Sequence, residues 1–167
     1  MGVRIRVAKP GEEQRLTWIQ RQAWSPETSP VPPHSSEGSI FDGHVEAGNV
    51  LVADESGLAV GFSKLVPLTT SSPQLAGTGD HVQQLHGFSV LPDHRGRGIG
   101  RMMLAAVRAE ALRRGATRVT LRVLSTNQRA MRLYRAAGYE VEGRLGGEFR
   151  IGDRLVDDVL MELELPS

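Results

Sequence analysis

The feature that most constrains this chain is a glycine- and arginine-rich run between two elements of regular structure. In residues 95–100, three glycines alternate with other residues, after a predicted strand at 82–90 and at the start of a predicted helix at 98–114. The first N–H groups of a helix lack acceptors within the helix and carry partial positive charge, so they bind anions. Glycines let the backbone approach a phosphate closely. The run therefore predicts a pyrophosphate site.

Arginines strengthen this prediction, and two well-known phosphate loops are excluded. Arg95, Arg97 and Arg101 can add charge-assisted hydrogen bonds to the anion. A Walker A loop requires a lysine followed by serine or threonine after its last glycine, and this run has no such lysine. A dinucleotide fingerprint that starts at Gly96 requires a sixth-position glycine, where Arg101 stands. The pattern that remains is Arg-x-x-Gly-x-Gly.

Composition limits the class of protein. The chain has 167 residues, of which 40% are apolar and 23% are charged, and this predicts a single globular domain over residues 1–167. The absence of cysteine excludes disulfides, thiolate metal sites and an acyl-cysteine intermediate. Residues 1–10 alternate and carry charge, unlike a signal peptide, and no apolar run reaches the roughly 20 residues of a membrane span. We expect a cytoplasmic protein without a membrane partner.

Apolar periodicity gives the order of elements. Strands are predicted at 3–7, 50–54, 58–67, 82–90, 118–123, 139–150 and 154–165. Helices are predicted at 12–23 and 98–114, with a third that ends at Ala137 and a short one at 39–47. Segment 25–36 is predicted to be an irregular loop, and segment 69–80 to be mobile. Ser125 and Gln128 form a candidate capping box for the third helix. The order predicts an α/β domain with a mixed sheet and helices on both faces.

Two motifs then identify a family resemblance. The pattern Arg95-x-x-Gly98-x-Gly100 at the start of a helix resembles the cofactor motif of the GCN5-related N-acetyltransferases, the GNAT superfamily. A second motif of the family matches downstream, where the chain reads Leu121-x-Val123-x-x-x-Asn127-x-x-Ala130-x-x-Leu133-Tyr134-x-x-x-Gly138-Tyr139. The resemblance implies the GNAT fold: a mixed, mostly antiparallel twisted sheet of about seven strands with splayed central strands. It also implies acetyl-CoA as the acyl donor, without a metal.

The resemblance implies roles for individual residues. The cofactor phosphates would be held by the run of seven residues Arg95, Gly96, Arg97, Gly98, Ile99, Gly100 and Arg101. Backbone groups of Phe88, Ser89 and Val90 would pair with the pantetheine arm, and an N–H near Val90 would stabilise an oxyanion. Asn127 would contact the arm, cap its helix, or do both. Tyr134 would donate a proton to the departing thiolate, and its alternative role is ordinary helix packing.

The general base is left open by the sequence. Gln84 lies near the position where several relatives carry a glutamate, and glutamine cannot accept the proton of an ammonium group. His86, two residues further on, should face the same side of a regular strand and has a suitable pKa range. A water relay is an equal alternative, and so is a purely structural role for His86.

The acceptor pocket is expected from the first helices, the 25–36 loop and the final hairpin. Its candidate residues are Trp18, Trp24 and His34, with Glu37, Asp42, Asp157 and Asp158 as acidic groups that attract a cationic amine or are simply solvated. None of these features selects the acceptor. We expect a small amine or amino acid, and a peptide N-terminus is left open. A homodimer is also left open.

Two other functional classes compete with the enzyme. A GNAT-fold protein that binds acyl-CoA as a sensor or scaffold is supported by Gln84 at the base position. Nucleic-acid binding would use the arginines around helix 98–114, but these do not form one stripe and no aromatic stacking motif accompanies them. The net charge of +1 also gives no strong attraction to nucleic acid. We therefore expect no nucleic-acid partner.

Overall fold

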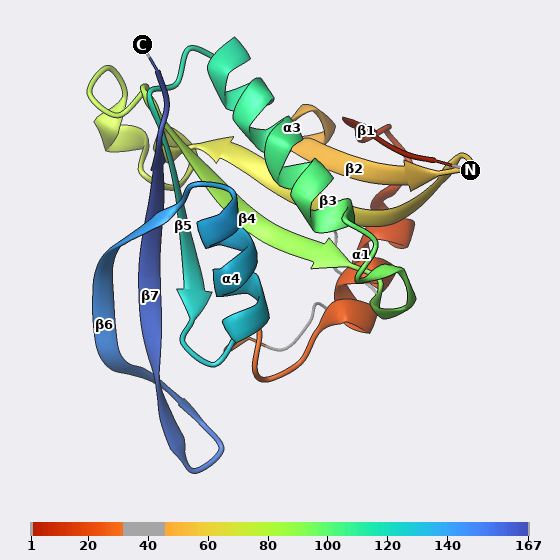
Figure 1. Cartoon of the computed structure of the whole chain (residues 1–167). Helices are drawn as coiled ribbons and strands as arrows, with labels where there is room; N and C mark the ends of the chain where they lie inside the picture. The colour runs from red at the N-terminus through yellow and green to blue at the C-terminus, as the bar shows by residue number, and fades with distance from the viewer. Residues whose placement is uncertain (1, 32–45, 167) are drawn as a thin grey trace.

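The computed structural model describes residues 2–31 and 46–166, which form a seven-stranded sheet with helices against it (Figure 1). The strands are β1 (Val3–Val7), β2 (Val50–Glu55), β3 (Leu58–Pro67), β4 (Val82–Val90), β5 (Arg118–Leu124), β6 (Glu140–Ile151) and β7 (Arg154–Glu164). The α-helices are α1 (Glu13–Ala23), α2 (Leu68–Ser71), α3 (Ile99–Arg113) and α4 (Gln128–Ala136). Three short 3₁₀ segments are η1 (Ala47–Asn49), η2 (Pro73–Leu75) and η3 (Pro92–His94).

The sheet is mixed, with the strand order β1-β2-β3-β4-β5-β7-β6. Every neighbouring pair is antiparallel except β4 and β5, which are parallel. These two central strands pair only through residues 82–84 and 118–120, and Figure 1 shows them diverging beyond that point. The predicted sheet, including the splay of its central strands, is confirmed.

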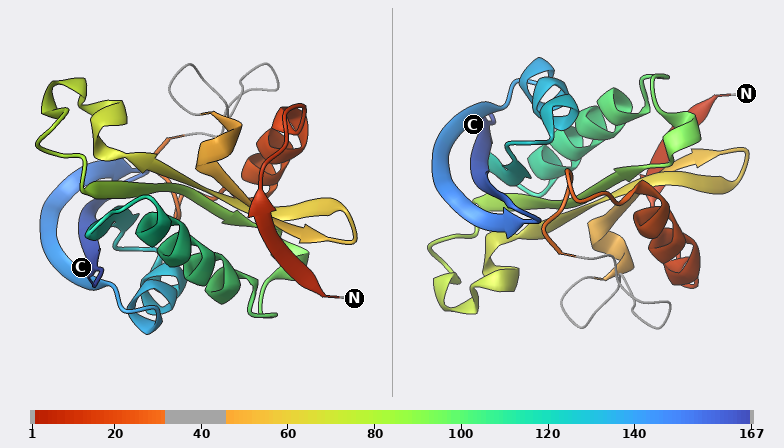
Figure 2. Two further views of the ribbon diagram at one scale, coloured as in Figure 1. Left: turned by 90° about the horizontal axis from the view of Figure 1, so that it is seen from above. Right: turned by 90° about the horizontal axis from the view of Figure 1, so that it is seen from below.

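Helices cover both faces of the sheet, as predicted (Figure 2). On one face, Leu16 and Ile19 of α1 are fully buried in a cluster that includes Phe62 of β3. On the other face, α3 and α4 contribute to a second cluster, with Val107 and Met131 among its buried side chains. Apolar residues three or four apart on each helix produce these buried faces. The two cores hold the elements on either side of the splay in place.

Most predicted elements appear with shifts of one or two residues at their ends, and the predicted Ser125 cap is wrong. The cap of α4 is Asn127, whose Oδ1 accepts from the Ala130 N–H at 3.2 Å. Ser125 does not cap the helix, because its hydroxyl accepts from the backbone N–H of Asp157 in β7. Within segment 69–80, which was expected to be mobile, α2 and η2 form short helical turns. The predicted helix at 39–47 lies largely outside the described residues.

Candidate functional site

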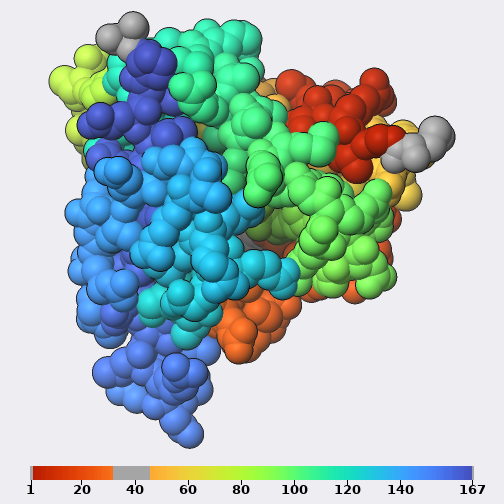
Figure 3. Space-filling view, viewed as in Figure 1, coloured from red at the N-terminus to blue at the C-terminus, as the bar shows by residue number. Residues whose placement is uncertain are grey.

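A cavity of about 1240 Å³ occupies the gap where β4 and β5 diverge. It is lined by both strands, by the start of α3, by α4 and by the segment that follows α1. The space-filling view shows this hollow between α4 and the loop before α3, with the segment after α1 at its lower edge (Figure 3). The unpaired part of the sheet is therefore the place where the candidate site forms.

The start of α3 forms one wall of the cavity. Gly98 is its N-cap, with φ of 81° and no side-chain hydrogen bond at the cap. The first bond closed at this end runs from the Met102 N–H to the Gly98 carbonyl. The three N–H groups at 99–101 precede this bond and so have no partner within the helix. This end of α3 therefore presents donors and partial positive charge to the cavity.

Glycine is needed at the three positions of the run for different structural reasons. Gly96 and Gly98 adopt positive φ angles of 75° and 81°, and a Cβ on either would meet no atom within 4 Å. Their requirement is conformational, because side-chain-bearing residues rarely adopt such angles. Gly100 has an ordinary helical conformation, but a Cβ there would lie 2.8 Å from Cδ2 of Leu133. Gly100 thus allows α3 to pack closely against α4.

Four arginines line the cavity, and one of them, Arg122, is paired with Asp158. Arg95 donates from Nε to the Val90 carbonyl at 3.2 Å and from Nη2 to the Ala23 carbonyl at 3.4 Å. Its pKa is lowered by burial and by the nearby guanidinium of Arg129. Within residues 2–31 and 46–166, no carboxylate lies within 4.0 Å of Arg95, Arg101 or Arg129. Their positive charge is therefore available to an anion.

Arg97, which was predicted to bind the anion, does not line the cavity. Its Nη2 donates to Oε1 of Glu55 at 2.6 Å, and the same carboxylate lies 3.1 Å from Nε2 of His94. These contacts direct the Arg97 side chain toward the end of β2. Its backbone still forms part of the glycine loop, but its charge is already balanced by Glu55.

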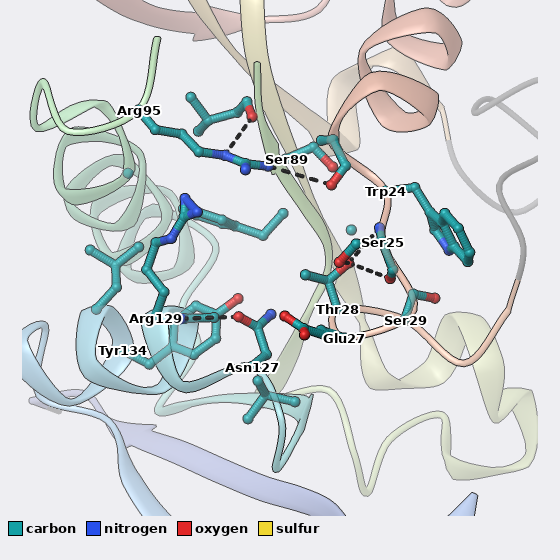
Figure 4. Close-up of a pocket in the computed structure, with 18 of the residues that line it drawn as sticks. Trp24, Ser25, Glu27, Thr28, Ser29, Ser89, Arg95, Asn127, Arg129 and Tyr134 are labelled. Carbon is teal, nitrogen blue, oxygen red and sulfur yellow. Dashed lines mark hydrogen bonds between the residues drawn. The ribbon is translucent and has the colours of Figure 1, made fainter. Parts of the chain in front are cut away.

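Tyr134 of α4 lies against the cavity between two other aromatic rings. It is 7% exposed, and its ring centroid is 5.9 Å from both Phe88 and Tyr139. Burial raises the pKa of its phenol above the usual value of 10. In the close-up, its hydroxyl points into the cavity on the side where Asn127 lies (Figure 4). The hydroxyl is thus a donor that stays protonated across the physiological pH range.

The edge of β4 faces the gap with backbone groups. The Leu91 N–H donates to the Val60 carbonyl in β3 at 2.9 Å. Because peptide groups alternate along an extended strand, the N–H and carbonyl of Val90 point the other way, toward the gap. The bond from Arg95 to the Val90 carbonyl agrees with this direction. The backbone here can pair with an extended ligand and can donate to a developing negative charge.

His86 lies outside the cavity lining. A register shift beside Gly87, whose φ is 55°, marks a bulge in β4. His86 and Gln84 share a side of the strand, as predicted, with Nε2 3.3 Å from Oε1. Partial burial and the nearby charge of Lys64 lower the pKa of His86. The ring is therefore neutral near pH 7, but it does not face the cavity directly.

Only some of the residues predicted for the acceptor pocket line the cavity. Trp24 lines the cavity, whereas Trp18 is 39% exposed beneath the guanidinium of Arg15. Asp158 is 3% exposed and forms an ion pair with Arg122, so it is neither solvated nor open to an amine. Asp157 binds Arg144 and accepts a hydrogen bond from the Gly147 N–H. The final hairpin contributes no residue to the described lining. His34, Glu37 and Asp42 lie outside the described residues.

Three charged residues of the cavity, Arg122, Arg129 and Glu27, could not be assigned to it from the sequence. Arg129 lies two residues after Asn127 in the second motif, and its position in the first turn of α4 could have suggested it. Glu27 lies in the segment after α1, where no periodicity indicates which side chains face inward. In the part of the chain that the structure describes, no group of three or more His, Cys, Asp or Glu is placed to hold a metal ion. No helix among these residues is long and apolar enough to cross a membrane.

Known proteins resemble this chain in sequence and fold. The model of the acetyltransferase (GNAT) family matches residues 14–139. The uncharacterized N-acetyltransferase YhfO of Bacillus subtilis is 34% identical over 91 residues, which cover 54% of this chain and 58% of YhfO. The chain thus spans little more than half of that relative.

Solved structures share the fold along nearly the whole chain. The structure of smu.2055 from Streptococcus mutans UA159 has a TM-score of 0.83 at 25% identity, with 99% of this chain and 100% of that chain covered. The structure of yncA from Salmonella typhimurium with its cofactor acetyl-CoA has a TM-score of 0.74 at 22% identity, with 100% and 96% covered. Both likenesses extend well beyond the two sequence motifs.

Proposed function

The chain belongs to the GNAT acetyltransferase family, and we propose that it is an N-acetyltransferase that moves an acetyl group from acetyl-CoA to a primary amine. The observation that carries this proposal is the cavity in the gap between β4 and β5. One wall of it is an anion-binding helix start, and another is the segment after α1. A donor and an acceptor can therefore meet within one cavity, in a ternary complex. The absence of cysteine excludes an acyl-cysteine intermediate and so favours direct transfer.

The cavity residues fit acetyl-CoA as the donor. The N–H groups at 99–101 and the guanidinium groups of Arg95, Arg101 and Arg129 would hold the phosphates. The free edge of β4 from Phe88 to Val90 would pair with the amide groups of the pantetheine arm. Asn127 would lie beside this arm. The acetyl-CoA in the yncA structure supports this choice of donor.

The transfer step needs an oxyanion donor and a partner for the leaving sulfur. The amine nitrogen attacks the thioester carbonyl, a C–N bond forms, the C–S bond breaks, and the nitrogen loses a proton. The Val90 N–H would stabilise the carbonyl oxygen as negative charge develops. Tyr134 would donate its hydroxyl hydrogen to the departing thiolate. Because burial raises its pKa, Tyr134 is better suited to stabilise the thiolate by a hydrogen bond than to transfer the proton fully.

Proton removal from the incoming ammonium is assigned to a water relay. Gln84 cannot accept a proton, and the ring of His86 does not line the cavity. His86 would receive the proton through water, since its lowered pKa keeps the ring neutral near pH 7. The alternative function is an acyl-CoA-binding sensor or scaffold without catalysis, which the substitution of glutamine at position 84 favours.

An acceptor screen separates the enzyme from the sensor. We would incubate the chain with acetyl-CoA and a panel of alkylamines, polyamines, amino acids, amino-acid amides and short peptides. Free thiol would report turnover, and mass spectrometry would detect a product heavier by one acetyl group. The enzyme predicts amine-dependent thiol release with a matching acetylated product. Tight CoA binding with no product across the panel would instead support the sensor.

A further inference from the structure

The segment from Trp24 to Val31 has a fixed shape that presents one residue, Glu27, at its turn. The Ser25 carbonyl accepts from the N–H groups of Thr28 at 3.0 Å and Ser29 at 3.2 Å. The Thr28 hydroxyl accepts from the Ser25 N–H at 3.1 Å, and Nε1 of Trp24 donates to the Val31 carbonyl at 2.8 Å. These bonds make the segment a single closed turn rather than an extended linker.

The same turn is attached to both sides of the gap in the sheet. The Thr126 hydroxyl, just before α4, donates to the backbone carbonyl of Glu27 at 2.9 Å. Arg95, before α3, donates to the Ala23 carbonyl at the end of α1. The turn therefore spans the cavity from the β4 side to the β5 side. Glu27 is held where it can contact a molecule that enters between the two strands.

Glu27 is the only carboxylate among the described residues that line the cavity. Its carboxylate has no hydrogen bond or ion pair within the described parts of the chain, because its one contact uses the backbone carbonyl. Figure 4 shows the side chain turned into the cavity on the side of Asn127 and Tyr134. Nearby Arg122 is already paired with Asp158. Among residues 2–31 and 46–166, no partner therefore compensates the negative charge of Glu27.

We propose that Glu27 binds the ammonium group of the acceptor and selects amines that carry no carboxylate beside the nitrogen. This inference rests on the proposed acetyltransferase function and names the acceptor class for the same site. A fixed carboxylate attracts a cation and disfavours an anion at the same place. In a free α-amino acid, the amine and the carboxylate are attached to the same carbon, so both groups would approach Glu27. Amino-acid amides, peptide N-termini and simple amines avoid this repulsion.

Matched pairs of probes test the inference. Glycine, leucine, phenylalanine and lysine would each be compared with the corresponding amide, which has the same side chain and amine but no carboxylate. For pairs that are used, we expect the wild-type kcat/KM to favour the amide. Glu27→Gln should raise KM for the amide about tenfold, the size of one charge-assisted hydrogen bond, and reduce the preference by a similar factor. Comparing both enzymes on one pair cancels the difference in amine basicity.

Glu148→Gln provides the control, because it makes the same charge change on an exposed residue of β6 outside the cavity lining. This variant should keep the wild-type preference. CoA affinity and Tm should be unchanged in Glu27→Gln. This result would show that the donor side and the fold are intact in the variant. An unchanged preference in Glu27→Gln, or a loss of CoA binding, would overturn the role of Glu27 while the acetyltransferase function stands. If the wild-type protein acetylates no amine in the full panel, the proposed function fails and this inference fails with it.

Discussion

The proposed donor and acceptor sides of the cavity are built in different ways. The donor side, within residues 82–139, consists of a strand edge, two helix starts and the glycine loop between them. The acceptor side consists of an irregular turn that is held by side-chain bonds to residues far away in the sequence. The first can recognise its ligand largely with backbone groups, whereas the second depends on individual side chains. Donor binding should therefore tolerate sequence change better than acceptor choice does.

The two sides also differ in charge. The donor side carries the guanidinium groups of Arg95, Arg101 and Arg129, and the acceptor side carries the carboxylate of Glu27. This polarity suits a polyanionic donor on one side and a cationic acceptor on the other. It also predicts that substitutions on the two sides affect different kinetic constants.

The largest effect is expected at the helix start. Gly98→Glu places a side chain at a φ of 81° and a negative charge beside the phosphates, so we expect CoA affinity to fall by at least about 100-fold. Gly115→Glu is the matched control at the other end of α3, where φ is 78° and a Cβ would also meet nothing within 4 Å. Calorimetric titration with CoA would compare the two. Equal losses would show that the effect is strain alone, and the donor site would have to be placed elsewhere.

The next largest effect is expected at the two tyrosines, which share burial but differ in position. Tyr134→Phe should lower kcat about 100-fold, as expected for loss of a donor to the leaving group, with little change in CoA affinity. Tyr139→Phe removes a buried hydroxyl that has no hydrogen-bond partner among the described residues, so it should leave kcat unchanged. Steady-state kinetics with an acceptor from the screen would measure both. A wild-type rate in Tyr134→Phe would remove its assigned role.

A smaller contrast is expected between two arginines of the same loop. Arg101→Gln should weaken CoA binding about tenfold, because Arg101 lines the cavity and no carboxylate in the described parts of the chain pairs with it. Arg97→Gln should weaken it far less, because the guanidinium of Arg97 is bound to Glu55. Affinities measured at two salt concentrations would also show a stronger salt dependence for the Arg101 contribution. The reverse order would mean that Arg97 leaves Glu55 when the donor binds.

The smallest effect is expected at His86. A ring outside the cavity lining and linked only through water should contribute much less than a direct base, so His86→Asn should lower kcat/KM about threefold. Because the pKa of His86 lies below 6.5, any loss of activity from its protonation belongs below pH 6.5. The pH–rate profile from 5.5 to 9.5 would test this, with His81→Asn as control. A tenfold loss together with removal of an acidic limb would make His86 the direct base.

Regular elements could be predicted from the sequence, but long-range side-chain partners could not. The bounds of β3 and β4 were predicted without error, because apolar alternation and the flanking turns define them locally. The partner of Arg97 is 42 residues away in the chain, and that of Arg122 is 36 residues away. No local pattern indicates such pairs, so Arg97 was assigned to the anion.

The acceptor side was hardest to predict for the same reason. The position of Glu27 depends on the bond from Thr126 across 99 residues. The cap of α4 also depends on a long-range contact. Ser125 and Asn127 are both good capping residues, and the hydrogen bond from the Asp157 N–H to the Ser125 hydroxyl decides between them. The proposed donor site, in contrast, was suggested by local motifs, because a glycine turn at a helix start has its own sequence pattern.

The short pairing between β4 and β5 has a mechanical consequence for the whole domain. Strands β1–β4 and strands β5–β7 are two half-sheets that share only three residue pairs at one end of the gap, and the contact between Thr126 and Glu27 bridges its other end. A ligand that hydrogen-bonds within the gap acts as an inserted strand and adds its binding free energy to the stability of the folded state. Thermal unfolding should then occur at rising temperature as CoA concentration increases. A ligand in the gap would thus connect the two half-sheets for as long as it is bound.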